Sequence, residues 1–195
     1  MQKHSNQIRI IGGQHRGRKL AFVDAQGLRP TPDRVRETLF NWLMPVIAGS
    51  RCLDLFAGSG ALGFEAWSRG ARQVVLVDSH PPAVRGLRDN LGVLASAMAG
   101  EVVSVVQSDG LAFLNNTPAQ GFDIVFLDPP YRANLLPDCI ARLESGGWLR
   151  DAAWIYLEAP QSVDLPTLPP NWQLRRSKRA GQVGYHLLYR EAPAA

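Results

Sequence analysis

The sequence has few of the residues that build disulfide bridges or metal sites. It contains 2 cysteines, Cys52 and Cys139, and 4 histidines, and they do not follow the spacing of a metal-ligand motif. We interpret both cysteines as buried free thiols in a reducing cytoplasm. The histidines are assigned surface or packing positions rather than catalytic ones, and no metal site is expected.

Long apolar runs are also missing. The longest, 74–77 and 124–127, are far shorter than the ~20 residues that a membrane-spanning helix needs. Residues 1–7 lack the apolar segment of a secretory signal. Hydrophobic residues make up 46% of the chain and charged residues 19%, which is typical of a globular protein. We therefore expect one cytoplasmic domain over 1–195, away from membranes, and nothing demands more than a monomer.

Acidic residues are scarce at the two ends of the chain. The net charge is +4, but residues 1–36 carry +6 and residues 175–190 carry +5, which leaves −7 for the rest. Phosphate neutralisation supplies much of the affinity for nucleic acid, so two basic ends around an acidic middle suit a polyanion-binding surface. Solvated charge runs without a partner are the simpler alternative.

The order of the predicted elements indicates an α/β fold. Residues 8–23 predict a small hairpin with a basic turn, and Thr31 is the expected N-cap of an amphipathic helix whose first position is Pro32. Strands are then predicted at 52–56, 73–77, 102–106, 122–127 and 154–158, with helices at 61–68, 82–94 and 135–143 and a short one after residue 109. Such alternation predicts a parallel sheet with right-handed crossovers. Residues 172–179 and 183–189 add an antiparallel hairpin, which makes seven strands.

A glycine-rich turn follows the first strand of this pattern. Gly58-Ser59-Gly60-Ala61-Leu62-Gly63 opens a helix, and Asp78 ends the next strand about 20 residues later. The glycines permit a tight turn and close ligand approach, and the acid can accept both hydroxyls of a ribose. The pattern favours a nucleoside-bearing cofactor over a turn that serves packing alone.

Two further acids bear on the choice of cofactor. Asp54 lies four residues before Gly58, where an acid suits an ammonium-bearing ligand and is unfavourable beside a pyrophosphate, so S-adenosylmethionine is favoured over NAD. Ser108 and Asp109, at the third strand's end, are placed to reach the adenine amino group of the same cofactor. For Asp109 a helix N-cap is an equally good interpretation.

Asp128-Pro129-Pro130-Tyr131 follows the apolar strand 122–127 directly. The prolines end the strand, so an acid lies at its carboxyl end, where ligands bind in open α/β sheets. The carboxylate of Asp128 and the carbonyl of Pro129 offer two acceptors, and Tyr131 offers a face for stacking. This combination suits the exocyclic amino group of a planar base. An ordinary Asp-Pro turn is the alternative.

Together these motifs resemble a family of small bacterial methyltransferases that modify the exocyclic N2 of a guanine in small-subunit (16S) ribosomal RNA, the RsmD type. The resemblance covers nearly the whole chain and rests on the stretches 29–40, 53–63 and 128–131, together with 11–13 and 16–18. It implies a Rossmann-like class I fold that depends on S-adenosylmethionine. Asp128 to Tyr131 also occurs in adenine-N6 and glutamine-N5 methyltransferases, many of which carry Asn at position 128.

The resemblance adds to the list of candidate site residues and implies that the chain has two parts. Residues 1–48 become an RNA-contacting extension and 49–195 the catalytic core, with ribosomal RNA, within a partly assembled small subunit, as the partner. The candidate catalytic residues are Asp128, Pro129, Pro130 and Tyr131. The candidate cofactor-binding residues are Asp54, Phe56, Ala57, Gly58, Ser59, Gly60, Gly63, Asp78, Ser79, Ser108 and Asp109. The candidate RNA-binding residues are Arg16, Arg18, Lys19, Arg29, Thr31, Arg34, Arg36, Arg175, Arg176 and Lys178, with Arg179 beside them.

Three other functions stay open at this point. A different methyl acceptor, adenine N6 in nucleic acid or a protein glutamine amide, fits the same acceptor motif. A nicotinamide-dependent oxidoreductase fits the glycine turn, although the sequence offers no proton-donor constellation for it. A non-catalytic RNA-binding module fits the basic ends, but the intact stretches 58–63 and 128–131 argue against it.

Overall fold

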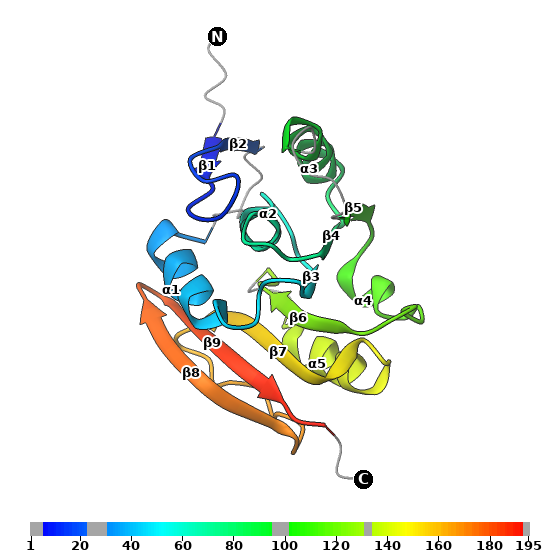
Figure 1. Ribbon diagram of the computed structural model, residues 1–195. Helices are drawn as coiled ribbons and strands as arrows, with labels where there is room; N and C mark the ends of the chain where they lie inside the picture. Colours follow the sequence, from blue (N-terminus) through cyan, green and yellow to red (C-terminus); the bar gives the residue numbers. More distant parts are fainter. Residues whose placement is uncertain (1–5, 23–30, 95–101, 131–133, 193–195) are drawn as a thin grey trace.

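The computed structural model describes residues 6–22, 31–94, 102–130 and 134–192 (Figure 1). A two-stranded antiparallel hairpin, β1 (Asn6–Arg9) and β2 (Lys19–Phe22), precedes α1 (Asp33–Leu43). The main strands are β3 (Arg51–Asp54), β4 (Gln73–Asp78), β5 (Val102–Gln107), β6 (Phe122–Leu127), β7 (Leu149–Pro160), β8 (Trp172–Ala180) and β9 (Val183–Arg190). The helices between them are α2 (Ala61–Ser68), α3 (Pro81–Leu94), α4 (Gly110–Phe113) and α5 (Leu136–Ser145).

The seven main strands form one sheet in the order β5-β4-β3-β6-β7-β9-β8. The five strands from β5 to β7 are parallel, and β9 and β8 extend the sheet antiparallel. The chain builds outward from β3 to β4 and β5, and then returns to place β6 on the other side of β3. The strand order therefore reverses between β3 and β6, and such a switch point at the carboxyl edge is where open α/β sheets bind ligands.

Helices cover both faces of the sheet (Figure 1), and strand alternation divides the core between them. On one face, Ile124 and Phe126 of β6 pack in the cluster that contains Leu39 of α1 and Phe64 of α2. On the other face, the neighbouring side chains of β6 pack in a second cluster with α5.

The N-terminal hairpin is part of the first cluster rather than a separate lobe. Ile8, Ile10 and Leu20 are buried there. The backbone N–H groups of Ile11 and Gly12 donate to the carboxylate of Glu65 in α2, at 2.8 and 2.9 Å. The helix that follows the glycine turn thus anchors the hairpin.

The fold predicted from the sequence is confirmed, with local corrections. The Thr31 N-cap is wrong: α1 begins at Asp33, its N-cap residue is Pro32, and no side chain caps it. The first strand of the core ends at Asp54, two residues earlier than predicted, and β7 is longer than 154–158. Both cysteines are free and buried, as predicted. Among the described residues, no helix is long and apolar enough to cross a membrane.

Candidate active site

The glycine turn after β3 is held in a conformation that requires glycine. Gly60 is the N-cap of α2 and has a φ of 78°, in the left-handed region. A Cβ atom at this position would lie 2.5 Å from the ring of Phe64 and 2.7 Å from Leu87. The turn is tied to β4 because the N–H of Ala57 donates to the carbonyl of Val77 at 2.8 Å.

Asp78, at the end of β4, lies beside this turn as predicted. Its Oδ2 accepts a hydrogen bond from the N–H of Gly58 at 2.8 Å, and its Oδ1 accepts one from the N–H of His80 at 2.8 Å. The residue is partly exposed. The acid thus fixes the turn and still faces solvent, where each carboxylate oxygen keeps a second lone pair.

Asp54 is buried at the carboxyl end of β3, with 2% of its surface exposed. Its Oδ2 accepts a hydrogen bond from the N–H of Gly63 at 2.9 Å. Burial, together with the charge of Asp78, raises the pKa of Asp54 to about 7, although backbone N–H groups of Gly63 and Phe56 lower it. No cationic side chain in the described segments pairs with Asp54. A desolvated carboxylate of this kind favours a ligand that brings a positive charge.

Asp128 directly follows the last residue of β6. It is partly buried, with Pro129 buried and Pro130 exposed after it. Burial raises the pKa of Asp128 well above its ordinary value, and the charges of Glu158 and Asp54 raise it further. The acids predicted from two separate motifs therefore lie on either side of the switch point and sense each other electrostatically.

Glu158, near the end of β7, completes this acidic group and was missed by the sequence analysis. It is 4% exposed, and its Oε1 accepts hydrogen bonds from the hydroxyl of Tyr156 at 2.7 Å and from Thr31 at 3.1 Å. Burial and the charge of Glu158 raise the pKa of Tyr156. The available signal was that Glu158 is an acid at the end of a predicted strand, the same property that identified Asp78 and Asp128.

The other cofactor candidates gather around the turn. The side chain of Asp109 caps α4 by accepting from the N–H of Ala112 at 3.0 Å, so its N-cap interpretation is confirmed. Phe56 reaches this region, because a Cβ atom on Gly110 would lie 2.8 Å from its ring. Ser59 is buried, whereas Ser79 is exposed. Tyr131 lies outside the described residues.

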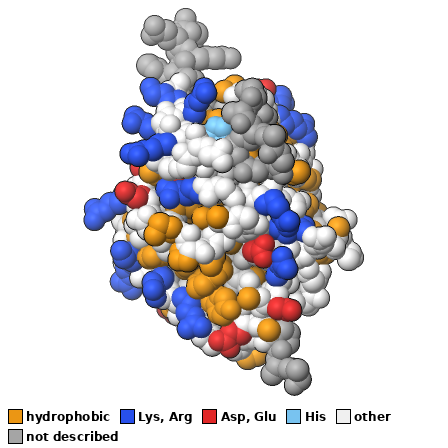
Figure 2. Space-filling model, in the orientation of Figure 1, with side chains coloured by type: hydrophobic (Ala, Val, Ile, Leu, Met, Phe, Trp, Pro, Cys, Tyr) orange, Lys and Arg blue, Asp and Glu red, His pale blue; other side chains and the backbone are white. Residues whose placement is uncertain are grey.

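Most of the basic candidates lie on the surface. Figure 2 shows Lys and Arg side chains along the side of the molecule that carries the β1–β2 hairpin, α1 and β8. The exposed candidates are Arg16, Arg18, Lys19, Arg34, Arg175, Arg176, Lys178 and Arg179. Arg29 lies outside the described residues.

Two of the predicted RNA-contacting side chains, those of Arg36 and Thr31, are buried rather than exposed. Arg36 is 1% exposed and is committed to the protein interior, because its Nη2 donates to Asp33 at 2.6 Å and to the carbonyl of Arg9 at 2.9 Å. Thr31 is 6% exposed, and its hydroxyl donates to Glu158. The packing of α1 against the sheet and the hairpin removes both side chains from reach of a phosphate.

A family model described as conserved hypothetical protein 95 matches residues 8–189 of the chain. The chain is 53% identical over 190 residues to ribosomal RNA small subunit methyltransferase D of Escherichia coli (strain K12), with 96% of this chain and 92% of the relative covered. It is 46% identical over 182 residues to the protein of the same name from Haemophilus influenzae, with 93% of each chain covered. The solved structure of yhhF from Escherichia coli, at 53% identity, superposes with a TM-score of 0.87 over 96% of this chain and 100% of that one.

Proposed function

The chain belongs to the family of ribosomal RNA small subunit methyltransferase D, and from this membership we propose that it transfers the methyl group of S-adenosylmethionine to the exocyclic N2 of a guanine in small-subunit ribosomal RNA. The methyltransferase activity on small-subunit ribosomal RNA is the activity named for the relatives. Guanine N2 as the acceptor atom comes from the resemblance of the motifs. The proposed compartment is the cytoplasm, where this RNA is assembled.

The observation that carries the proposal is the placement of Asp54 and Asp128 on the two sides of the switch point. They lie at the carboxyl ends of the adjacent strands β3 and β6, and the charge of Asp54 acts on Asp128. A buried acid that favours a cation stands next to an acid suited to an amino group. A site that brings a cationic methyl donor to an amine needs both.

The residues around the glycine turn fit S-adenosylmethionine. Asp54 would hold the ammonium group, and the turn at Gly58 to Gly63 would allow close approach of the rest of the molecule. Asp78 would hold the ribose hydroxyls, and Ser108 and Asp109 would lie near the adenine. When bound, S-adenosylmethionine supplies a methyl group made electrophilic by its sulfonium.

Asp128 and Pro129 would position the acceptor. The lone pair of a guanine amino group is delocalised into the ring, so the nitrogen is a weak nucleophile. By accepting the two amino hydrogens, the carboxylate of Asp128 and the carbonyl of Pro129 would turn that lone pair toward the methyl group. Placement of this kind can contribute roughly 7 to 11 kcal/mol, more than a single hydrogen bond. The nitrogen becomes acidic once it is methylated, and its proton can then pass to Asp128.

The RNA would lie along the basic side of the molecule. Arg16, Arg18 and Lys19 at the hairpin and Arg175, Arg176 and Lys178 on β8 are exposed and available for phosphates. With Arg34 and Arg29 they form the proposed contact surface, and residues 1–48 act as its extension. Tyr131 would stack on the target base, which must be splayed from its neighbours. We propose a monomer that acts on a partly assembled small subunit.

The test is methyl transfer from labelled S-adenosylmethionine to 16S RNA, partly assembled small subunits, DNA and protein. We expect label in RNA, recovered as N2-methylguanosine after digestion to nucleosides. Asp128→Ala should abolish transfer while the dissociation constant for S-adenosylmethionine, measured by calorimetry, stays near that of the wild type. Asp164→Ala, which removes an exposed acid in a loop, is the matched control and should retain activity. Label on DNA or protein alone, recovery as N6-methyladenosine, or wild-type turnover by Asp128→Ala would refute the proposal.

A further inference from the structure

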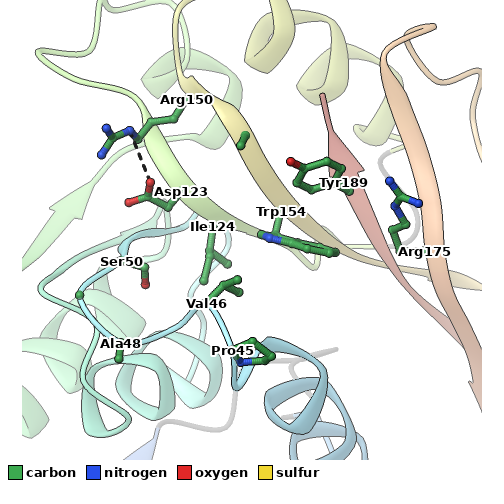
Figure 3. A pocket seen from close by; sticks show the side chains of 12 residues that line it. Pro45, Val46, Ala48, Ser50, Asp123, Ile124, Arg150, Trp154, Arg175 and Tyr189 are labelled. Atoms are coloured by element: carbon green, nitrogen blue, oxygen red, sulfur yellow. Dashed lines mark ion pairs between the residues drawn. The ribbon is translucent and has the colours of Figure 1, made fainter. Parts of the chain in front are cut away.

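A surface hollow lies at the amino ends of β6 and β7, whereas the candidate active site lies at the carboxyl ends of the parallel strands. Figure 3 shows the side chains that line it. Its volume is about 710 Å³. The chain just after α1 forms one wall, with Pro45 and Val46, and the early part of β7 and the late part of β9 form the floor. The floor side chains lie on the face of the sheet that α1 covers, beyond the point where that helix ends.

Two aromatic rings form the floor of the hollow. Trp154 of β7 and Tyr189 of β9 are paired across the strands, and their ring centroids are 4.8 Å apart at an angle of 48°. Both side chains are only partly buried. Flat rings that stay accessible at a concave surface are suited to stacking against another flat group.

Two arginines line the hollow beside these rings. The guanidinium of Arg175 lies 5.3 Å from the centroid of Tyr189, and its side chain is 42% exposed. Arg150 is 57% exposed and faces Asp123 at 3.5 Å, and Arg175 faces Glu191 at 3.5 Å. Exposed pairs of this length are weak and are screened by salt. The lining of the hollow thus carries two arginines, Arg150 and Arg175, and one carboxylate, that of Asp123.

A β-bulge places Arg175 over the hollow. Leu174 pairs with Leu188 and Arg176 pairs with Leu187, so Arg175 is an extra residue in β8. In a regular strand, residues three apart point to opposite faces. The bulge instead allows Arg175 and Lys178 to share one face, where Lys178 lies 5.9 Å from the ring of Trp42.

This shared face connects the hollow to the candidate active site. Trp42 of α1 stacks on Tyr185 of β9, with centroids 5.6 Å apart and an angle of 26°. Tyr185 pairs with Glu158 at the active-site edge, and Tyr189 lies four residues further along the same strand, about 13 Å away. Contacts between a cation and an aromatic ring thus extend from the carboxyl ends of the parallel strands toward their amino ends.

We propose that this hollow binds an unpaired nucleotide of the RNA whose target base enters the site at Asp128. The base would stack on Trp154 and Tyr189, and its phosphate would lie against Arg175. Single-stranded RNA is recognised by such combinations of aromatic faces and arginines, and the exposed basic residues that continue along β8, Arg176, Lys178 and Arg179, favour a polyanion over a peptide. The inference rests on the proposed function for the identity of the RNA.

The experiment measures binding of a fluorescein-labelled ten-nucleotide oligoadenylate by anisotropy at several salt concentrations. Tyr189→Leu keeps an apolar side chain but removes the flat ring, and should raise the dissociation constant about 5- to 150-fold. Arg175→Ala should lower the slope of log affinity against log salt by about 0.7, the value for one phosphate contact on a single strand. Both variants should raise KM for 16S RNA methylation with little change in kcat. Arg85→Ala, which removes an exposed arginine on α3, should change none of these values.

Several results would overturn the inference. Unchanged oligonucleotide affinity and an unchanged salt slope in Arg175→Ala would be sufficient to overturn it. Arg175 is exposed on an edge strand, so this variant remains a valid test even if thermal melting shows that Tyr189→Leu is unstable. Weaker binding to assembled subunits with unchanged oligonucleotide binding would assign the hollow to a protein partner. A change confined to self-association, seen by sedimentation, would assign it to a second copy of the chain. Normal methylation by both variants refutes the inference alone, whereas absence of RNA methylation by the wild type refutes the proposed function.

Discussion

Arg36 and Glu65 lie against each other in the protein interior, with Nη1 of Arg36 3.6 Å from Oε2 of Glu65 and side chains that are 1% and 0% exposed. Glu65 also accepts from Nε of Arg69 at 2.7 Å and from the N–H groups of Ile11 and Gly12. One carboxylate therefore joins α1, α2 and the N-terminal hairpin. The basic hairpin proposed to contact RNA is fixed to the helix that follows the cofactor turn.

Removal of this carboxylate should strongly destabilise the protein. Glu65→Ala removes one of the two carboxylates that face the buried guanidinium of Arg36, takes the ion-pair partner of Arg69 away and leaves two backbone N–H groups unpaired, so we expect a loss of about 3 to 5 kcal/mol in the free energy of unfolding. Urea denaturation measures this loss of stability. The control, Glu37→Ala on the exposed side of α1, should stay within about 0.5 kcal/mol of the wild type. Equal effects of the two variants would contradict the role of Glu65.

Gly13 and Gly17 in the hairpin turn should respond differently to alanine. Both have positive φ, 75° and 85°, so each substitution carries a conformational cost of about 1 to 2 kcal/mol. A Cβ atom on Gly13 would also lie 1.7 Å from the carbonyl oxygen of Ser68 at the end of α2, whereas one on Gly17 meets nothing within 4 Å. Gly13→Ala should therefore lower the midpoint of thermal unfolding clearly more than Gly17→Ala. Equal midpoints of thermal unfolding for the two variants would show that the hairpin does not dock on α2.

Asp54 should make stability depend on pH in a defined direction. Its pKa of about 7 in the folded protein exceeds the ordinary value of about 3.9 in an unfolded chain, so the protonated form favours folding. This stabilisation is fully present below about pH 4 and is lost as the pH rises through 7, by about 4 kcal/mol in total. Asp54→Asn retains an acceptor for Gly63 and should gain stability relative to the wild type as the pH rises from 5 to 8.

Urea denaturation at several pH values measures this difference. Asp138→Asn, which neutralises an exposed acid of α5, is the control and should follow the wild type at every pH. The same Asp54→Asn protein should bind S-adenosylmethionine more weakly at pH 8, because the ammonium group loses its charged partner. Parallel stability curves for Asp54→Asn and the wild type would contradict the raised pKa.

Glu158→Gln should shift the pH dependence of methyl transfer. After burial, the charge of Glu158 is the main cause that raises the pKa of Asp128, so its removal lowers that pKa. If the ionised form of Asp128 accepts the amino hydrogens, the acid limb of kcat against pH should move to lower pH. The glutamine keeps a carbonyl to accept from Tyr156 and Thr31. The control, Glu37→Gln, should leave the acid limb at the pH of the wild type. A shift of the acid limb to higher pH in Glu158→Gln would contradict the effect assigned to the charge of Glu158.

The positions of the helices and strands could be predicted from the sequence because each element is encoded by neighbouring residues. The alternation of short apolar strands with helices predicted the sheet, and the turn at Gly58 to Gly63 and the motif at Asp128 were placed at strand ends, where the structure has them. The amphipathic helix predicted after Pro32 is present as α1, where Val35, Leu39 and Leu43 are buried and Trp42 is partly buried. Arg36 and Phe40 are buried beside them, however, so the covered face is wider than the pattern of apolar residues indicates.

The sequence alone thus determined the α/β fold, the glycine turn, and the acids Asp54, Asp78 and Asp128, because hydrophobic periodicity and turn chemistry act over a few residues. Only the tertiary structure decided that Arg36 pairs with Glu65, that Thr31 donates to Glu158 across 127 residues of chain, and that a bulge brings Arg175 over Tyr189. Whether a charged side chain reaches solvent depends on what packs over it. That packing is set by contacts between segments far apart in the sequence, which no local pattern records.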